Sequence, residues 1–342
     1  MAVLTEKENM MRLLRGEIPE WIPRYTIGPV RGLENKTPAV GSVAPRFLNE
    51  HRFRGGGKDI WGVEYITSHE AAGGLMPKSW DFILDDVTKW RDVIKAPSLE
   101  GFDWEALCKK DLETSRCDRT QSALAMSVGH GYFQELMAYM GFTEGLCALY
   151  EEPEECEALF NYLADFYCEI VEKTIDYYKP DIYNLADDTA AWGNPFVSLD
   201  MFRRFFLPMY KREMQAALDR GIPVLYHNCG KCEIFIPDMV EAGITSWNPA
   251  QTCNDLVGIQ EKYGRDLVLM GCWDTMNVVD PKLSDQDIYD YFQSIADARA
   301  KNGGFAFLVT ILLPDGDKDP RMLHVNDVVN KALAEIGHNF YK

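Results

Sequence analysis

The second half of the chain alternates between short apolar runs and longer amphipathic segments. The segment before Pro180 carries its apolar residues at steps of four, three and four, the spacing of the buried face of a helix: Leu159, Leu163, Phe166 and Ile170. After it we expect strands at 181–188, 223–228, 244–248, 266–271 and 305–312. Helices are expected between and after them, at 198–221, 233–243, 255–264, 283–304 and 325–337. This alternation with short connections predicts a parallel sheet.

The first half is less regular. Thr5 and Glu8 predict a capping box for a short helix that Gly16 ends, and a first strand is expected at 21–27. Residues 28–70 are rich in Gly, Pro and Arg and are expected to form long loops, whereas 86–113 supplies short amphipathic helices. In the second half, Ser198 is expected to cap the helix at 198–221, and Pro208 to kink it.

Several of the predicted strands end in polar or reactive residues, as in "NLADD", "YHNCG", "SWNPAQ" and "GCWDT". In a (β/α)8 barrel, the residues just past the carboxyl ends of the strands line the active site. A doubly wound open sheet would show the same alternation of elements. The chain has neither a G-x-G-x-x-G after the first strand nor a G-x-x-x-x-G-K-[ST] motif, so nucleotide-binding versions of that fold lack support. We therefore expect an α/β protein with a single (β/α)8 TIM barrel domain over residues 1–342, with an N-terminal helical and loop extension.

Composition narrows the classes of partner. The 342 residues include 53 acidic and 35 basic ones, a formal net charge of −18, which disfavours nucleic acid and anionic membranes. The start of the chain lacks the apolar core of a signal peptide, and no later run is long and apolar enough to span a membrane. Without an export signal, the nine cysteines are expected to be reduced thiols. We expect a soluble cytoplasmic protein.

The stretch "PVLYHNCGKC" gives the sharpest chemical signal. His227 and Cys229 are two residues apart at a strand end, so their side chains would face the same space and could hold zinc. The alternative is a core cysteine beside a histidine whose ring binds a backbone carbonyl. Cys272 ends another apolar strand, and as a third ligand it would leave a fourth position open, as catalytic zinc sites do. Cys232 and Cys253 are further sulfur candidates, or inert buried thiols.

Acid–base candidates lie at the ends of other strands. Asp187 and Asp188 are adjacent carboxylates suited to general acid or base work, because mutual repulsion raises one pKa. The alternative is that Asp187 orders the loop while only Asp188 faces the pocket. His130, between two glycines, is a third candidate catalytic residue or a turn histidine without function, and Asp274 is a weaker candidate.

Three aromatic residues follow the same strand ends and could form a wall for a flat substrate, or only pack in the interior: Trp192, Tyr132 and Trp247.

Taken in order, these stretches resemble the uroporphyrinogen decarboxylase superfamily, which includes corrinoid-dependent methyltransferases. The resemblance extends over nearly the whole chain. It is carried by "TEKENMMRLLRGEIPEWIPRY", "LADDTAAWGNPFVSLDMFRRFFLPMYKREM", "YHNCGKCEIFIPDMVEAG" and "LMGCWDT". It implies a (β/α)8 barrel with its site at the carboxyl ends of the strands.

The two branches of the superfamily imply different sites. The decarboxylases need no metal and hold substrate carboxylates with arginines of an "RQAGR"-type segment. Here that segment reads "RYTIGPVRG", with Arg24 and Arg31 but without the motif. The methyltransferase branch binds zinc through His-x-Cys and a late cysteine. His227 and Cys229 match the first two ligands, and Cys272, one strand earlier than expected, would replace the third, with Cys232 as the alternative.

The resemblance therefore implies a methyltransferase that moves a methyl group between a small methylated substrate and a corrinoid (cobalamin) on a partner protein. The methyl donor would be a methoxylated aromatic or a methylamine, Arg31 would join the substrate-binding residues, and zinc would act as the Lewis acid. Two alternatives stay open. One is a metal-free decarboxylase in which Asp187 or Asp188 stabilises a protonated pyrrole, and the other is a non-catalytic scaffold barrel. The sequence also leaves a homodimer open.

Overall fold

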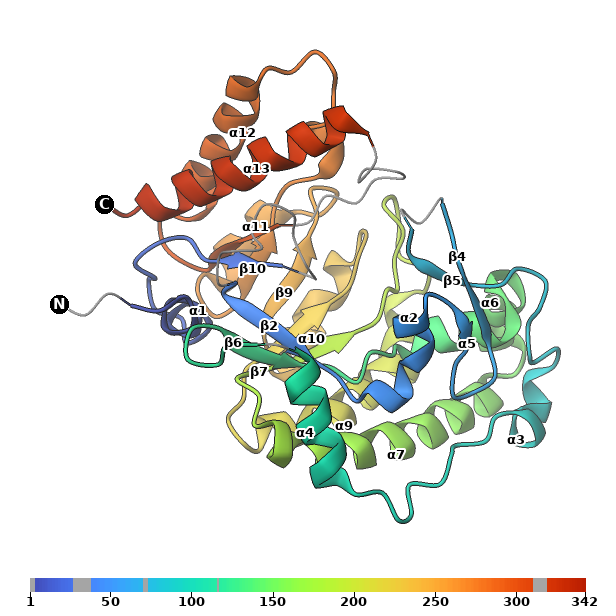
Figure 1. Cartoon of the computed structure of the whole chain (residues 1–342). Helices are drawn as coiled ribbons and strands as arrows, with labels where there is room; N and C mark the ends of the chain where they lie inside the picture. Colours follow the sequence, from blue (N-terminus) through green and yellow to red (C-terminus); the bar gives the residue numbers. More distant parts are fainter. Residues whose placement is uncertain (1–3, 27–37, 70–72, 116, 310–318) are drawn as a thin grey trace.

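The protein is a nearly closed barrel of eight parallel strands. The structure, a computed structural model, describes residues 4–26, 38–69, 73–115, 117–309 and 319–342. Within these residues the hydrogen-bonded order of the sheet is β1-β11-β10-β9-β8-β7-β6-β2. The strands are β1 (Arg24–Tyr25), β2 (Val40–Val43), β6 (Ala123–Met126), β7 (Ile182–Ala186), β8 (Val224–His227), β9 (Ile244–Ala250), β10 (Val268–Gly271) and β11 (Phe305–Leu308) (Figure 1). This confirms the predicted (β/α)8 TIM barrel.

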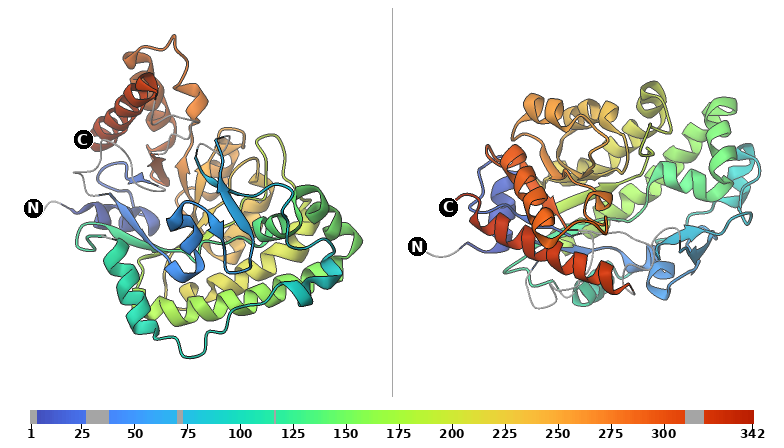
Figure 2. Two further views of the ribbon diagram at one scale, coloured as in Figure 1. Left: turned by 45° about the vertical axis from the view of Figure 1, so that its right-hand side comes forward. Right: turned by 90° about the horizontal axis from the view of Figure 1, so that it is seen from above.

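Helices surround the barrel on its outer side (Figure 2). The longer ones are α4 (Trp104–Ser115), α5 (Tyr132–Met140), α6 (Phe142–Glu151), α7 (Pro153–Tyr178), α9 (Leu207–Leu218), α11 (Leu256–Tyr263), α12 (Asp285–Arg299) and α13 (Pro320–Asn339). The shorter α10 (Ile236–Ala242) joins β8 to β9. The helices predicted in the second half are therefore present, with shifted ends.

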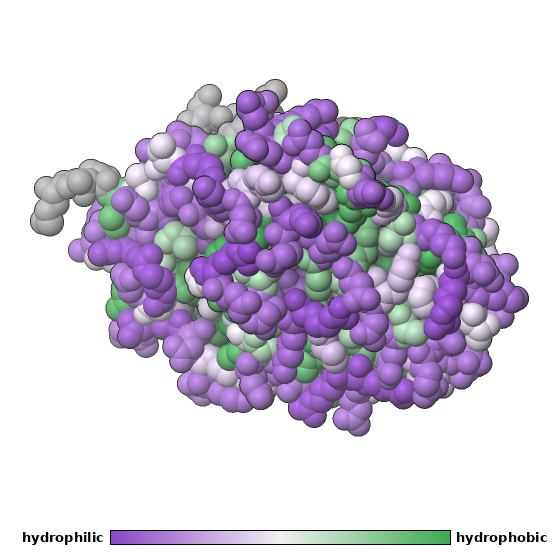
Figure 3. Space-filling model, turned by 90° about the horizontal axis from the view of Figure 1, so that it is seen from below, coloured by the Kyte–Doolittle hydropathy of each residue, from purple (hydrophilic) through white to green (hydrophobic). Residues whose placement is uncertain are grey.

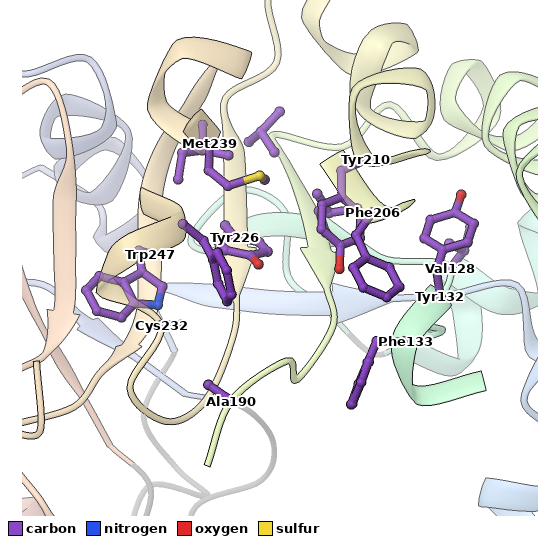
Figure 4. Close-up of a cluster of buried hydrophobic side chains, with 14 of the residues drawn as sticks. Val128, Tyr132, Phe133, Ala190, Phe206, Tyr210, Tyr226, Cys232, Met239 and Trp247 are labelled. Carbon is purple, nitrogen blue, oxygen red and sulfur yellow. The ribbon is translucent and has the colours of Figure 1, made fainter. Parts of the chain in front are cut away.

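The buried side chains form two layers, as alternation along barrel strands requires. The inner layer fills the barrel with residues such as Ala123, Ala125, Val268 and Met270, and α1 (Glu6–Leu14) contributes Met10, Leu13 and Leu14 to it. The outer layer lies between strands and helices and contains the predicted stripe of α7. Figure 4 shows part of this outer layer, including Phe206, Tyr210, Tyr226 and Trp247.

Local sequence signals explain several helix ends. Thr5 and Glu8 form the predicted capping box of α1, and the side chain of Ser198 accepts from the backbone of Met201 at the start of α8 (Leu199–Met201). Between α8 and α9 the chain makes a π-helical turn, Phe202–Phe206, and Pro208 lies in the first turn of α9. The irregularity expected near Pro208 is thus a π-helical turn, a common form of helix irregularity.

The region predicted as long loops contains more structure than expected. It includes β2, the helix α2 (Glu50–Arg54) and two strands, β3 (Gly57–Lys58) and β4 (Glu64–Thr67). These two strands form a small antiparallel sheet with β5 (Leu75–Pro77), which lies just beyond the predicted loop region. Strand β2 has only four residues, two of them Gly41 and Ser42, which hides it in the sequence. A Cβ atom at Gly41 would lie 2.5 Å from Cys117 Sγ, so close packing requires glycine there.

The surface is mostly polar. On the face in Figure 3, hydrophilic residues dominate and apolar ones form scattered spots, as is usual for a protein surface. None of the helices in the described ranges is both long and apolar enough to cross a lipid bilayer.

Candidate metal and substrate site

Three neighbouring strands bring the chemically distinctive residues together. Asp188 follows β7, His227 is the last residue of β8, and Cys229 lies two positions beyond it. The sheet register places Ala186 beside His227, and His227 beside Asn248 of β9. All of these positions lie at the carboxyl end of the barrel, where barrel enzymes place their active sites.

One ligand atom each from Asp188, His227 and Cys229 lies within 4.8 Å of the others. His227 Nε2 is 3.7 Å from Cys229 Sγ and 3.7 Å from Asp188 Oδ1. Zinc bonds of about 2.0–2.3 Å at tetrahedral angles separate ligand atoms by roughly 3.3–3.8 Å. The two separations from His227 Nε2 fall in this range, and the nitrogen, sulfur and oxygen atoms are ligand types of a zinc site with one position free.

Neighbouring groups orient each of these side chains. Asn248 Oδ1 lies 2.5 Å from His227 Nδ1 and accepts a hydrogen bond from it, so the lone pair of Nε2 faces Cys229 and Asp188. Asp188 Oδ1 accepts from the backbone N–H of Cys229 at 2.8 Å, and Asp188 Oδ2 from Gln134 Nε2 at 3.4 Å. This second set of contacts is typical of metal sites.

Cys229 needs a compensating charge to ionise. Burial raises the pKa of its thiol, and the Asp188 carboxylate raises it further. A bound dication would oppose both effects, because coordination favours the thiolate.

A chamber of about 460 Å³ opens beside this group, and Asp188 lies in its wall. Residues of α2, the small antiparallel sheet and α5 supply 11 of the 26 described lining residues. Four phenylalanines line it: Phe82, Phe133, Phe142 and Phe196. Its described polar lining includes the carboxylates of Asp59, Glu135 and Asp188 and the guanidinium of Arg52. The size and the aromatic wall suit a small flat molecule.

A buried histidine lines the same chamber. His130 follows β6, and its Nε2 lies 2.9 Å from Glu213 Oε2. Tyr132 and Tyr183 donate to the same carboxylate at 2.8 and 2.7 Å. Burial lowers the pKa of His130, but the Glu213 and Glu135 carboxylates outweigh it and raise the pKa overall. Burial raises the pKa of Glu213, but His130 and the two tyrosines lower it overall.

The sequence pattern described as "Uroporphyrinogen decarboxylase (URO-D)" matches residues 128–309, just over half of the chain. The chain belongs to the uroporphyrinogen decarboxylase family. The matched region contains the metal-ligand group, His130 and Glu213.

A solved structure with a similar fold covers nearly the whole chain. A methyltransferase from Methanosarcina mazei has a TM-score of 0.66 and 13% sequence identity, covering 99% of this chain and 100% of that one. A putative vitamin-B12 independent methionine synthase from Listeria monocytogenes has a TM-score of 0.45 and 8% identity, covering 97% of this chain and 86% of its own. Among curated proteins, none matches the chain.

Cys272, predicted as the third metal ligand, is not part of the Asp188–His227–Cys229 group found among the described residues. Its backbone is left-handed, with φ 61°, and its side chain belongs to the outer buried layer. The charge of Arg299, on α12, acts on its thiol, whose pKa burial raises to about 12. The third group beside His227 and Cys229 is Asp188, which follows β7.

The adjacent carboxylates Asp187 and Asp188 have different environments. Asp187 is fully buried and accepts from the backbone N–H groups of Phe133 and Gln134 and from the hydroxyl of Tyr210. Burial raises the pKa of Asp187 to about 7, while these hydrogen bonds act in the opposite direction. A Cβ at Gly131 would lie 2.3 Å from Asp187 Oδ1, so this glycine admits the carboxylate. Asp187 orders the start of α5, and Asp188 faces the chamber.

The predicted aromatic wall is built from other residues. Trp192 is 55% exposed, Tyr132 is buried against Glu213, and Trp247 is fully buried and donates to Asn228 O. None of the three is among the described residues that line the chamber. Arg31 lies outside the described residues.

The remaining candidates have local partners. Cys232 is buried and its Sγ lies 3.4 Å from Asn228 O, and Cys253 is partly exposed. Asp274 accepts from the backbone and the hydroxyl of Thr252 and orders the loop after β9.

The sequence analysis missed Asn248, Glu135 and Glu213. Glu213 carried a readable signal, because it lies three residues after Tyr210 and four before Ala217, on the buried face of α9. A carboxylate on an apolar stripe indicates a buried partner. Asn248, in "SWNPAQ", carried no signal until the sheet register placed it beside His227.

Proposed function

We propose that this URO-D protein is a methyltransferase that moves a methyl group between a small methylated substrate and a corrinoid on a partner protein. The observation that carries the proposal is the Asp188–His227–Cys229 group, of which Asp188 lies in the wall of an aromatic chamber. A zinc ion held there would act as a Lewis acid on the substrate heteroatom from which the methyl group departs.

The chain's own residues have distinct roles in this proposal. His227 and Cys229 hold the ion, with Asp188 as third ligand, and Asn248 keeps His227 Nε2 directed at it. The phenylalanines of the chamber exclude water and position the ring or alkyl part of the substrate. The similar fold of a protein described as a methyltransferase is in keeping with this function, but the chemistry is argued from the site.

The charge of the chamber argues against the decarboxylase alternative. A tetrapyrrole substrate with several carboxylates needs basic residues around it, whereas the described lining contains the three carboxylates named above against the guanidinium of Arg52 and the imidazole of His130, which Glu213 already binds. Like charges in a partly buried site disfavour binding. The chamber favours a neutral or cationic substrate.

Elemental analysis of the purified full chain tests the proposal. We expect about one zinc per chain, less than a tenth of that in Cys229→Ser, and an unchanged content in the control Cys272→Ser. The zinc-loaded protein should then methylate reduced cobalamin from a methoxylated aromatic or a methylamine. Metal-free protein that decarboxylates uroporphyrinogen, or zinc that depends on Cys272 and not on Cys229, would contradict the proposal.

A further inference from the structure

The inner wall of the chamber contains a polar pair without a complete set of hydrogen bonds. His130 and Glu135 both line the chamber. His130 Nδ1 lies 3.9 Å from Glu135 Oε1, beyond hydrogen-bond distance, and the His130 side chain is only 5% exposed. Within the part of the chain that the structure describes, Nδ1 has no hydrogen-bond partner. A buried polar atom without a partner is costly and rare, so it indicates a group that a ligand supplies.

The histidine ring cannot turn to find another partner. Its Nε2 is bound to Glu213 Oε2, and its face stacks on the Tyr167 ring with centroids 3.4 Å apart and planes 6° apart. The Tyr132 ring packs edge-on against it. These contacts fix the direction of Nδ1, so its donor position is preorganised.

The pair offers one donor and one acceptor. The charged groups that act on His130 are Glu213 from α9, Glu135 from α5 and Asp187 after β7, and all three carboxylates favour a ring protonated on both nitrogens. The oxygens of Glu135 already accept from the hydroxyls of Tyr139 and Tyr167. Each carboxylate oxygen can accept a second hydrogen bond. An N–H and a carboxylate oxygen therefore stand side by side.

We propose that His130 and Glu135 form a subsite for the hydroxyl group of an aromatic substrate. The hydroxyl oxygen would accept from His130 Nδ1, and its O–H would donate to Glu135 Oε1. A hydroxyl is both donor and acceptor, so it can hydrogen-bond to His130 and to Glu135 at the same time. Neither an ether nor a methyl group can do this. The ring would pack against Phe133, Phe142 and Phe196, which already contact one another in the chamber wall.

The role of this subsite in substrate choice rests on the proposed function. If the chain is a methyltransferase, its methyl donors carry a free hydroxyl on the ring as well as the methyl group. A site built to bind a hydroxyl discriminates strongly against analogues without one, because its own polar groups would then stay unpaired. His130 and Glu135 would therefore set substrate choice.

Phenol and toluene test the subsite in the full-length protein by titration calorimetry, without metal or corrinoid. The two molecules have nearly the same shape, and a purely apolar chamber would prefer toluene, which water solvates less well. We expect phenol to bind about tenfold more tightly, the gain from hydrogen bonds to charged groups. His130→Phe should reverse the preference, and the matched control His324→Phe, at an exposed histidine paired with Asp285, should keep it.

A second measurement uses the unaltered protein in case His130→Phe does not fold. Phenol, but not toluene, should shift the imidazole resonances of one histidine, assigned with His130→Asn. Tighter binding of toluene by the wild type, or no shift with phenol, would show that only water hydrogen-bonds to His130 and Glu135. Either result would overturn the proposed hydroxyl subsite. Because neither ligand carries a transferable methyl group, a failure of the proposed methyl transfer would leave this preference intact.

Discussion

Two histidines at the carboxyl end of the barrel have opposite surroundings. His227 ends β8, and a neutral amide, Asn248, binds its Nδ1; its side chain is 20% exposed. His130 follows β6, and a carboxylate, Glu213, binds its Nε2; its side chain is 5% exposed. Each ring has one nitrogen fixed by a neighbouring side chain and the other directed into the site.

The partner determines what the free nitrogen can do. An amide oxygen that accepts a hydrogen bond from Nδ1 fixes the ring so that Nε2 points to the other ligands, which is the arrangement that a metal ion requires. A carboxylate orients the ring and also favours the protonated form, which turns the free nitrogen into a hydrogen-bond donor. In the two proposals above, the same residue type would serve two tasks, a metal ligand at one strand end and a binding donor at another.

Replacing each histidine by alanine is the strongest test of this division. His227→Ala should weaken zinc binding at least a hundredfold, because it removes a ligand rather than a supporting residue, whose loss costs about 10–100-fold. His130→Ala should leave zinc affinity within about twofold. Competition titration with a chromogenic chelator measures both. Equal losses in the two variants would mean that the histidines share one site.

Replacing Glu213, the carboxylate partner of His130, by a neutral residue tests whether this carboxylate favours the protonated ring. Glu213→Gln should lower the free energy of unfolding by about 3 kcal/mol, because a buried charge loses its counter-charge. The pKa of His130 should fall, since burial remains while the opposing carboxylate is lost. Denaturant unfolding and a histidine NMR titration report these two effects. A His130 pKa that does not change would show that Glu213 only fills space.

The sequence predicts those parts of the fold and the site that depend on a local pattern of apolar residues. It does not predict the parts that depend on how distant segments pack together. The barrel followed from alternating apolar runs and helical spacing, because strands β7 to β11 each stand out from the helices around them. Strand β2 was missed because four residues with a glycine carry too little pattern. The wall of the chamber formed by α2 and the small sheet was missed for the same reason.

Within the site, His227 and Cys229 were predictable because period-two alternation alone places them on one face. Cys272 looked equivalent, but its left-handed backbone places its thiol in the outer buried layer, and residue types do not report a positive φ outside glycine. That Asp188 and not Asp187 joins His227 depends on the hydrogen bonds that Asp187 makes with α5. Such contacts exist only once the elements are packed.

Removing the partner of His227 should have a moderate effect. Asn248→Ala should lower zinc affinity about 10–100-fold, because the ring loses the contact that fixes its orientation. The same chelator competition measures it. Thr245→Ala, on the same strand with a hydroxyl bonded to Val224 O, is the matched control and should bind zinc as the wild type does. If both variants bind zinc normally, Asn248 does not position the ligand.

The smallest effect is the pH dependence of the His130–Glu213 pair. The pKa of His130 is raised on folding, so its contribution to stability is complete below about pH 6.5 and is lost as the pH rises through the higher folded value. The pKa of Glu213 is lowered, so its contribution is present above about pH 4.5 and is lost in stronger acid. The difference in unfolding free energy between wild type and Glu213→Gln should therefore be about 1 kcal/mol larger near pH 6 than near pH 9.

Tyr183→Phe is the control for this measurement, because it removes a neutral donor to the same carboxylate. It should cost about 1 kcal/mol at both pH values, since no group that it removes titrates between them. A Glu213→Gln difference that stays equally flat would mean that His130 is unprotonated in the folded protein throughout. Glu213 would then only orient the His130 ring, as Asn248 orients His227. The two histidines would differ only in how exposed their side chains are.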